Sequence, residues 1–364
     1  MKVLLSGAFN PAFEALPEAL AAALREAGHG VSLFDHRAHF LPGRLRRRFA
    51  TLERIDRGRI NRRFLAAVGR LRPDLVLVNQ GMILTPESIT EARALGARCV
   101  NWFSDYPAEF EAGLRVAPAY DAVHLASSFA ADRHRAAGHL RSGWLPFGCD
   151  AAGTVSRVTA TPSRDDETPA VVFVGSHYPE RQVLLRFLRG LDVGIWGPGW
   201  ERASGDPHLH GMVRGGALRP AGWRALYRAA RVAVNIHYGC FGPREVSGDL
   251  ANTRVFEILA CGGAVQVVDR QADVLRLFGD GEHLAAFSSG EELRARVEHL
   301  LRDEEAGRRL AARGREAVLA RHTYVHRAAV LVAPLAPVAG RVPEEETRAT
   351  ERPLPVRLAA GGPA

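Results

Sequence analysis

The sequence predicts an α/β protein of two doubly wound, Rossmann-like domains that face each other across a cleft. Short apolar runs alternate with helical patterns along most of the chain, which is typical of parallel sheets covered by helices on both faces. The alternation is interrupted by the polar and aperiodic stretch 151–169, which reads as a linker, and it restarts at residue 170. A chain of 364 residues is also longer than one hydrophobic core ordinarily uses, so two domains are expected.

The first domain is predicted to occupy residues 1–150. Its expected strands are 2–7, 30–35, 74–79, 98–105, 121–128 and 143–148. Ligands of doubly wound domains bind at the carboxyl ends of the strands, so Ser6 and Gly7 at the end of the first strand are candidate ligand contacts. The alternative is a plain strand-to-helix turn, since the residues do not form the GxGxxG fingerprint of a dinucleotide site.

A carboxylate follows the fourth expected strand of this domain. Asp105 lies in NWFSDYP (101–107), directly before a Tyr-Pro turn, and is expected to point into the crevice where ligands bind. A carboxylate in that place suits a general base for a hydroxyl group, or a group that positions the hydroxyl. The alternative is an Asx turn or a helix cap, which is common for Asp before such a turn.

The second domain is predicted to occupy residues 170–332. Its expected strands lie near 170–175, 192–197, 232–237, 264–269 and 283–287. From residue 333 onward the chain is rich in Pro, Glu, Arg and Gly and has no periodicity. The segment 333–364 is therefore expected to be a disordered tail.

The segment FVGSHYPERQVLLRFL (173–188) predicts an anion-binding turn. It contains a strand, a Gly175-Ser176 turn and a helix opened by Pro179, and Pro is favoured in the first turn of a helix. Backbone amides at a helix start attract anions, and the forked guanidinium of Arg181 suits a diphosphate. The alternative for Arg181 is an exposed helix residue.

The segment LANTRVFEILACGG (250–263) predicts a short rigid helix. Its apolar residues recur at helical spacing, Asn252 or Thr253 suits the N-cap, and Gly262 suits the left-handed stop. Glu257 is then a carboxylate fixed on a helix, and a carboxylate accepts two hydrogen bonds side by side from a vicinal diol. The alternative is a surface ion pair with Arg254, three residues earlier.

The net charge of +8 is carried almost wholly by arginine, because Lys2 is the sole lysine. Such a balance favours anionic partners such as nucleoside diphosphates, anionic lipid or nucleic acid. The basic run 44–63 predicts a solvated helix face or, alternatively, a patch that docks on anionic lipid or an anionic acceptor.

Four scattered cysteines without a CxxC pair predict small buried thiols in a reducing compartment. The N-terminal apolar run is too short for a signal peptide, and no run approaches the ~20 residues of a membrane span. A cytoplasmic protein is expected. Single histidines without ligand spacing predict no metal site.

Three motifs together resemble the nucleotide-sugar signature of GT-B glycosyltransferases, especially the branch of spore-maturation glycosyltransferase-like proteins. They are RVFEILACGG, FVGS-x4-R and HTYVHR (322–327). In the related retaining family 4 enzymes, a Glu at the position of Glu257 grips the donor ribose, and a second Glu occupies the position of Asp249. Those enzymes also carry a Gly-Arg pair followed by a Lys, where this chain has Ser176 and Arg181; Arg254 or Arg244 is the expected substitute for the missing cation.

The resemblance implies a donor site, and the segment HGMVRGG implies the contact with the nucleotide base. The implied donor-binding residues are Gly175, Ser176, Arg181, Gly211, Met212, Val213, Asp249, Asn252, Thr253, Arg254 and Glu257. The implied acceptor-side residues are Ser6, Gly7, Asp105 and Tyr106. Asp105 and Arg181 would be the catalytic residues, the first acting on the acceptor and the second on the leaving diphosphate.

The function implied is transfer of a sugar from a nucleotide-diphosphate sugar, UDP-linked by the same resemblance, to a hydroxyl or amine acceptor without metal or cofactor. The acceptor class stays open between carbohydrate, lipid-linked and small-molecule compounds, as does the choice between retention and inversion. One rival is a nucleotide-sugar epimerase or isomerase of the same fold. Another is a basic nucleic-acid-binding protein, which the lack of interleaved aromatic residues in 44–63 disfavours.

Overall fold

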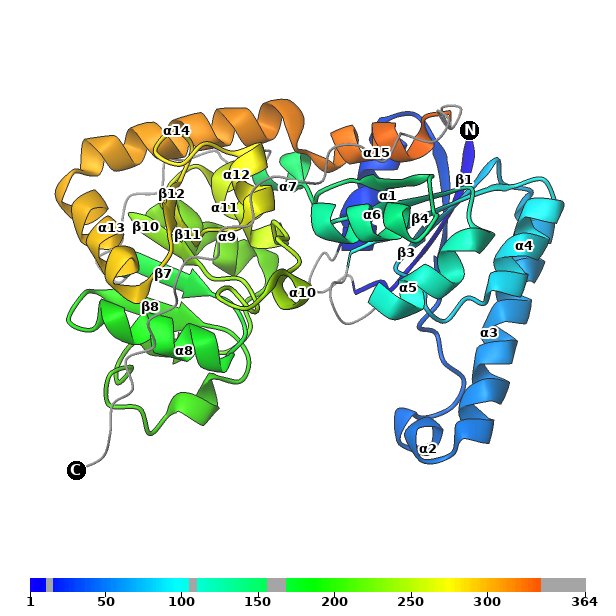
Figure 1. Cartoon of the computed structure of the whole chain (residues 1–364), viewed down its shortest axis with the longest axis horizontal. Coiled ribbons are helices and arrows are strands. Elements are labelled where there is room, and N and C mark those ends of the chain that lie inside the picture. The colour runs from blue at the N-terminus through cyan, green and yellow to red at the C-terminus, as the bar shows by residue number, and fades with distance from the viewer. Residues whose placement is uncertain (11–15, 105–109, 156–167, 335–364) are drawn as a thin grey trace.

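The computed structural model describes residues 1–10, 16–104, 110–155 and 168–334, which form two domains, each built on a six-stranded parallel sheet (Figure 1). The predicted fold class is confirmed. In the first domain the strand order is β2-β1-β3-β4-β5-β6, and in the second it is β12-β11-β10-β7-β8-β9. The second order is that of a dinucleotide-binding Rossmann domain, with its direction reversing between β7 and β10.

The first domain begins with a buried strand and a helix packed against it. Its strands are β1 (Lys2–Gly7), β2 (Gly30–Asp35), β3 (Leu75–Asn79), β4 (Arg98–Phe103), β5 (Ala122–Leu125) and β6 (Ser142–Trp144). Its helices are α1 (Leu16–Glu26), α2 (Gly43–Arg48), α3 (Ala50–Leu71), α4 (Pro86–Ala94), α5 (Phe110–Val116) and α6 (Ser128–Ala136), with a 3-10 turn at Ala117–Ala119. Every residue of β3 is buried because helices cover both faces of the sheet.

The second domain follows the short helix α7 (Ala151–Val155). Its strands are β7 (Val171–Val174), β8 (Val193–Trp196), β9 (Val213–Gly215), β10 (Val232–Asn235), β11 (Val265–Asp269) and β12 (Ala285–Phe287). Its helices are α8 (Pro179–Leu185), α9 (Pro220–Ala229), α10 (Arg244–Ser247), α11 (Thr253–Cys261), α12 (Ala272–Leu277), α13 (Gly290–Arg302), α14 (Glu304–Arg321) and α15 (Tyr324–Val332), with 3-10 turns at Arg186–Leu188 and Trp200–Ala203.

Successive residues of the central strand β7 enter different cores. Val171 and Phe173 pack with residues of α8 and α13, whereas Val172 and Val174 pack with residues of α9 and α11. This alternation is the period of two that a strand covered on both faces must show. It explains why the sequence of β7 is continuously apolar.

The last helices return the chain to the first domain. In Figure 1, α14 runs along the second domain and α15 lies over α1. The guanidinium of Arg327 on α15 donates to the carbonyl oxygens of Pro146 and Phe147 at 2.7 and 2.8 Å, and Thr323 and His326 form a capping box at the start of the helix. The HTYVHR motif therefore packs structurally and joins the two domains.

Most predicted strands extend one or more residues beyond the observed strands, and one strand was not predicted. The prediction 121–128 is too long because β5 ends at Leu125 and α6 begins at Ser128. The last strand of the first domain is Ser142–Trp144 and not 143–148, because the following residues extend toward the second domain and Cys149 pairs its backbone with His322 and Tyr324. The edge strand β9 was not predicted. It is only three residues long and its side chains are largely exposed, so no apolar run marks it.

Candidate functional site

A cavity of about 330 Å³ lies at the carboxyl ends of β7 and β10. These strands are neighbours in the sheet, but the chain passes through β8 and β9 between them, so they flank the point where the strand order reverses. Ligands of doubly wound domains bind at such a switch point. The lining residues are Phe173, Val174, Gly175, Ser176, Tyr178, Arg181, Asn235, Ile236, His237, Tyr238, Ser247, Leu250, Asn252, Thr253 and Arg254.

The charge of this lining suits an anion. Among the described residues that form it, Arg181 and Arg254 are cationic and none is a carboxylate. The start of α11 adds backbone N–H groups and the positive end of a helix dipole. The cavity therefore combines the two features that stabilise a bound phosphate.

The N-terminus of α11 is held in place by a pair of asparagines. Asn252 caps the helix, since its Oδ1 accepts from the backbone N–H of Val255 at 3.2 Å. The same amide exchanges two hydrogen bonds with Asn235 at the end of β10, at 3.0 and 3.1 Å. Gly262, at φ 69°, ends the helix in the left-handed conformation. Both predicted helix ends are thus confirmed.

A buried histidine and a buried aspartate hold the Asn252 cap in place through hydrogen bonds. His237 Nδ1 donates to Asp269 Oδ1 at 2.8 Å, and the backbone N–H of His237 donates to the same oxygen at 2.8 Å. Because His237 Nε2 accepts from the backbone N–H of Asn252 at 3.1 Å, the ring is neutral with its proton on Nδ1. Burial opposes ionisation of Asp269, but the interactions with His237 and Gln271 hold the pKa of its carboxyl below the usual value. A fixed carboxylate therefore sets the tautomer that orients the helix start.

Arg181 ties together the two strand ends that flank the cavity. Its Nε donates to Ile236 O at 2.9 Å and its Nη1 donates to Ser176 O at 2.8 Å. The guanidinium also lies 4.8 Å from the ring centre of Tyr178, and burial lowers its pKa below the usual value. Within the described part of the chain Nη2 donates no hydrogen bond, so that edge of the guanidinium is left for a bound anion.

Two tyrosines and a short loop form the mouth of the cavity. The rings of Tyr178 and Tyr238 meet edge to face with centres 5.1 Å apart. Both side chains are more than a third exposed. The loop after Tyr238 is fastened by Glu180 Oε1, which accepts from the backbone N–H of Gly239 at 3.0 Å. The loop that follows Tyr238 is thus held to α8 by this hydrogen bond.

Glu257 does not line this cavity but reaches a residue that does. Its Oε2 accepts from Arg254 Nη1 at 2.6 Å, so the ion pair that the spacing predicted as an alternative is present. Both side chains are about a quarter exposed, at 25% and 28%. Arg254 also lies 5.0 Å from the ring centre of Trp223. Burial alone would lower the pKa of Arg254, but Glu257 raises it.

Asp249 lies beside the cavity in a left-handed backbone conformation, with φ 54°. Its side chain is largely buried and pairs with the guanidinium of Arg244. The guanidinium carbon of Arg244 also lies 4.8 Å from the ring centre of Phe129 in the first domain. Arg244 therefore already has an anionic partner and an aromatic partner.

The residues expected to contact the nucleotide base lie outside the lining of this cavity. Met212 is buried in the core beside Leu209 and Trp200. Gly211 takes a left-handed conformation at φ 76°, and Val213 starts the edge strand β9 with 37% exposure.

The expected acceptor-side residues of β1 have structural partners. Ser6 is fully buried, and its Oγ lies 3.1 Å from His36 Nδ1. A Cβ at Gly7 would approach the ring of Pro17 to 2.7 Å, so this glycine allows α1 to pack closely on the strand. Asp105 and Tyr106 lie outside the described residues.

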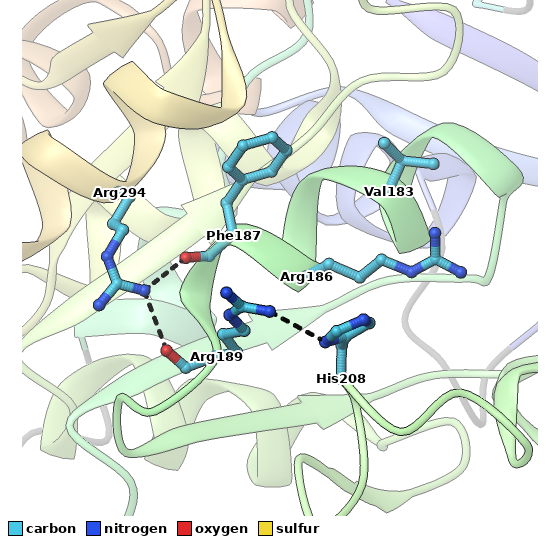
Figure 2. A pocket seen from close by; sticks show the side chains of 6 residues that line it. All are labelled: Val183, Arg186, Phe187, Arg189, His208 and Arg294. Atoms are coloured by element: carbon cyan, nitrogen blue, oxygen red, sulfur yellow. Dashed lines mark hydrogen bonds between the residues drawn. The ribbon is translucent and has the colours of Figure 1, made fainter. Parts of the chain in front are cut away.

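A larger cavity of about 590 Å³ lies away from the strand ends, on the outer side of α8 (Figure 2). Four of its six lining residues are basic: Arg186, Arg189, His208 and Arg294. Two of these are already neutralised, because Arg186 pairs with Asp206 and Arg294 pairs with Glu298. No strand end and no α-helix start lies among the described residues that line this larger cavity. We therefore choose the cavity at the switch point as the candidate ligand site.

The described residues hold no group of three or more His, Cys, Asp or Glu arranged for a metal ion. All four cysteines are buried and unpaired, as predicted, and burial raises the pKa of each thiol to about 12. No helix in the described ranges is long and apolar enough to cross a bilayer.

Sequence reasoning missed the support beneath the cavity, namely Asn235, Asp269 and Gln271. A usable signal was present, because Asn235 and Asp269 are polar residues that end two apolar strands. Only the strand order, which places β10 beside β11, brings His237 and Asp269 together.

Residues 181–333 match a protein family described as glycosyl transferase-like. The match begins at Arg181 and covers most of the second domain, including α11. No protein of curated function matches the sequence.

Several solved structures resemble this chain over both domains. HepE from Anabaena, solved in complex with UDP and glucose, has a TM-score of 0.63 at 13% identity, over 90% of this chain and 97% of HepE. Sucrose-phosphate synthase from Thermosynechococcus elongatus has a TM-score of 0.61 at 14% identity, over 90% and 96% of the two chains. The N-terminal domain of trehalose-6-phosphate phosphatase from Candida albicans has a TM-score of 0.65 at 12% identity, over 91% and 95%. At these identities the likeness establishes the GT-B fold.

Proposed function

We propose that the cavity at the ends of β7 and β10 is the donor site of this chain, which is a nucleotide-sugar-dependent glycosyltransferase of the GT-B fold. The observation that carries the proposal is the lining itself, in which two arginines and the start of α11 meet at the strand switch point without a described carboxylate. A nucleoside diphosphate places its charge where such groups converge.

In this proposal the diphosphate lies between Arg181, Arg254 and the first turn of α11. Transfer leaves negative charge on the departing diphosphate, and fixed cations and amides stabilise that charge without having to reorganise. Arg181 suits the role because two backbone hydrogen bonds already fix its guanidinium. The Asp269–His237–Asn252 chain fixes the helix start in the same way.

We propose that Glu257 binds the ribose of the donor. Its hydrogen bond to Arg254 uses Oε2 and sets the direction of the carboxylate. Oε1 then accepts from a ribose hydroxyl. The donor would be a UDP-sugar, by analogy with HepE, whose structures hold UDP and UDP-glucose. Gly211, Met212 and Val213 stay proposed base contacts that require movement of the segment before β9.

On the acceptor side, we propose that Asp105 positions or deprotonates the acceptor, with Tyr106, Ser6 and Gly7 nearby. An inverting transfer requires such a base, whereas a retaining transfer does not. The proposed division is therefore an acceptor-side domain at 1–150 and a donor-side domain at 170–332, joined by 151–169 and followed by a tail at 333–364. The finer assignment to the spore-maturation branch, and a cytoplasmic location suited to four buried thiols, belong to the same proposal.

The test is a thermal-shift panel of UDP, GDP, dTDP and CMP with their common sugars, on wild type and Glu257→Ala. A nucleotide at about 100 times its Kd should stabilise the protein by roughly 2.7 kcal/mol. We expect one nucleoside diphosphate to stabilise wild type and the Glu257→Ala variant to lose most of that effect. The matched control is Glu305→Ala on the exposed face of α14, which removes an Arg–Glu pair at the same spacing, with Arg308, and a second pair with Arg309.

The control separates loss of a ligand contact from loss of a helix ion pair. Equal responses of wild type and Glu257→Ala would remove the ribose role of Glu257. No response to any nucleotide, together with a response of both proteins to a polyanion, would overturn the donor site and favour a binding protein.

A further inference from the structure

The positive charge of the protein is concentrated in one short segment, residues 40–63, which we call the basic protrusion. It holds nine arginines and two carboxylates, a net charge of +7 in a chain whose total is +8. The remainder of the chain is close to neutral. The positive electrostatic potential of this segment is therefore local, and it attracts anionic surfaces to this part of the molecule.

The structure projects this segment away from the rest of the first domain. In Figure 1, α2 and the first turns of α3 extend beyond the sheet and beyond the neighbouring helices. No residue of α2 is buried. The buried stripe of α3 starts only at Asp56 and continues through Ile60, Phe64 and Val68, so the helix is anchored by its later turns alone.

The protrusion also exposes large apolar side chains. Phe40, Leu45, Phe49 and Ile55 are 44% to 48% exposed. Arginines accompany them: Arg59 and Arg63 lie 5.8 and 5.2 Å from the ring centre of Phe40, and Arg48 lies 5.8 Å from that of Phe49. A solvated charged face does not need these apolar residues.

One buried carboxylate holds the base of the protrusion in shape. Asp56 accepts from the backbone N–H of Phe40 at 2.8 Å and pairs with His39 Nδ1 at 2.7 Å and Arg46 Nε at 3.5 Å. Burial opposes its ionisation, but the hydrogen bonds from Phe40 and His39 hold the pKa of Asp56 below its usual value. The tip is therefore presented by a fixed base.

We propose that the basic protrusion docks on the surface of an anionic lipid bilayer. Its arginines meet lipid phosphates, and its exposed phenylalanine and aliphatic side chains enter the boundary between headgroups and acyl chains. Interfacial segments bind by this sum of apolar burial and electrostatic attraction. The arginines best placed are Arg44, Arg47 and Arg48, which are exposed and form no ion pair with a described carboxylate.

A lipid surface fits these observations better than a nucleic acid. Binding to a nucleic acid draws its affinity from phosphate contacts and from open aromatic faces on which bases stack. Here the rings of Phe40 and Phe49 already have arginine neighbours at 5.2 to 5.8 Å, and Leu45 and Ile55 are aliphatic and offer no stacking surface. The docking surface belongs to the proposed acceptor-side domain, but it does not depend on the donor assignment.

The test is co-sedimentation with phosphatidylcholine vesicles that contain phosphatidylglycerol, at about 0.15 M ionic strength. Each arginine near an anionic membrane contributes about fivefold in affinity, so Arg47→Gln/Arg48→Gln should weaken binding about 25-fold. The matched control is Arg308→Gln/Arg309→Gln on α14, which changes the net charge equally at another exposed site. We expect the control to bind like wild type.

A second pair of variants distinguishes lipid from other polyanions. Leu45→Ser/Phe49→Ser should reduce vesicle binding and leave binding to heparin and single-stranded RNA unchanged. The control Leu140→Ser/Val330→Ser, at other exposed apolar sites, should leave all three kinds of binding unchanged. Failure of wild type to sediment with the anionic vesicles would overturn the proposal. If the Leu45→Ser/Phe49→Ser substitution leaves vesicle binding unchanged, and the protein binds RNA more tightly than vesicles, the segment is a nucleic-acid site and the lipid proposal is wrong.

Discussion

The contact between the two domains contains a carboxylate that the fold keeps away from water. Asp273 on α12 is fully buried and accepts from the backbone N–H of Ser128, at the start of α6 in the first domain, at 2.8 Å. Its other oxygen has no hydrogen-bond partner within the described part of the chain. Burial raises the pKa of Asp273 to about 6, although the contacts with Ser128 and Arg276 oppose the shift.

The sign of the resulting pH dependence follows from linkage. A carboxyl whose pKa is raised in the folded state binds its proton more tightly when folded, so its unfavourable contribution is present above pH 6 and diminishes as the pH falls toward the unfolded value. A pKa raised by about two units costs roughly 3 kcal/mol in all. Between pH 7 and pH 5 about half of that penalty should disappear, which is roughly 1–2 kcal/mol.

The variant Asp273→Asn isolates this effect because it keeps the shape and the acceptor for Ser128 but cannot ionise. We expect wild type to gain roughly 1–2 kcal/mol of unfolding free energy relative to Asp273→Asn when the pH is lowered from 7 to 5. Urea unfolding followed by tryptophan fluorescence measures it, and the difference between the two proteins cancels the other titrating groups. Parallel pH profiles for the two proteins would show that the pKa of Asp273 is not raised in the folded state, which would refute the prediction.

Two further predictions concern the proposed donor site. Asp269→Asn places an amide where a carboxylate accepts two hydrogen bonds from His237. It should cost roughly 3 kcal/mol of unfolding free energy because a buried charged hydrogen-bond acceptor is lost. Denaturant unfolding measures this loss, and an unchanged unfolding midpoint would contradict the prediction. Arg181→Lys keeps the charge but cannot bridge the carbonyls of Ser176 and Ile236, so kcat should fall at least tenfold with a smaller change in KM. A rise in KM alone would show that Arg181 binds the ground state and does not act on the leaving group.

The fold was predictable because its central strands are buried on both faces. The run at 2–7 corresponds to β1 residue for residue, since a strand without a solvent face is a continuous apolar run. The run at 30–35 also matches β2, although this strand lies at the sheet edge and is only partly buried. The strand β9 carries no such signal. It lies at the sheet edge, where Val213 and Arg214 are exposed, and only the backbone pairing with β8 defines it.

The site was predictable where a single segment carries it. Asn252 as the cap, Gly262 as the stop and Arg181 after the Gly-Ser turn are local features, and the structure shows all three as helix and cavity elements. The pair of His237 and Asp269 is not local. It joins residues 32 positions apart, and it becomes visible only when β10 is known to lie beside β11. The packing of Met212 with Trp200 is not local either, because its place after a glycine turn gives no sign of that contact.

The helix α11 connects the packing of the two domains to the proposed donor site. Val255 and Phe256 are fully buried in a core that also contains Trp102 of the first domain and Tyr324 of α15. The residues just before them, Asn252 and Thr253, line the cavity. Side chains in such a core are close-packed, so a shift of one domain against the other must move α11 or repack around it. We therefore expect domain movement and binding at the proposed donor site to be coupled through the first turn of this helix, and the buried Asp273 lies in the same contact between the domains.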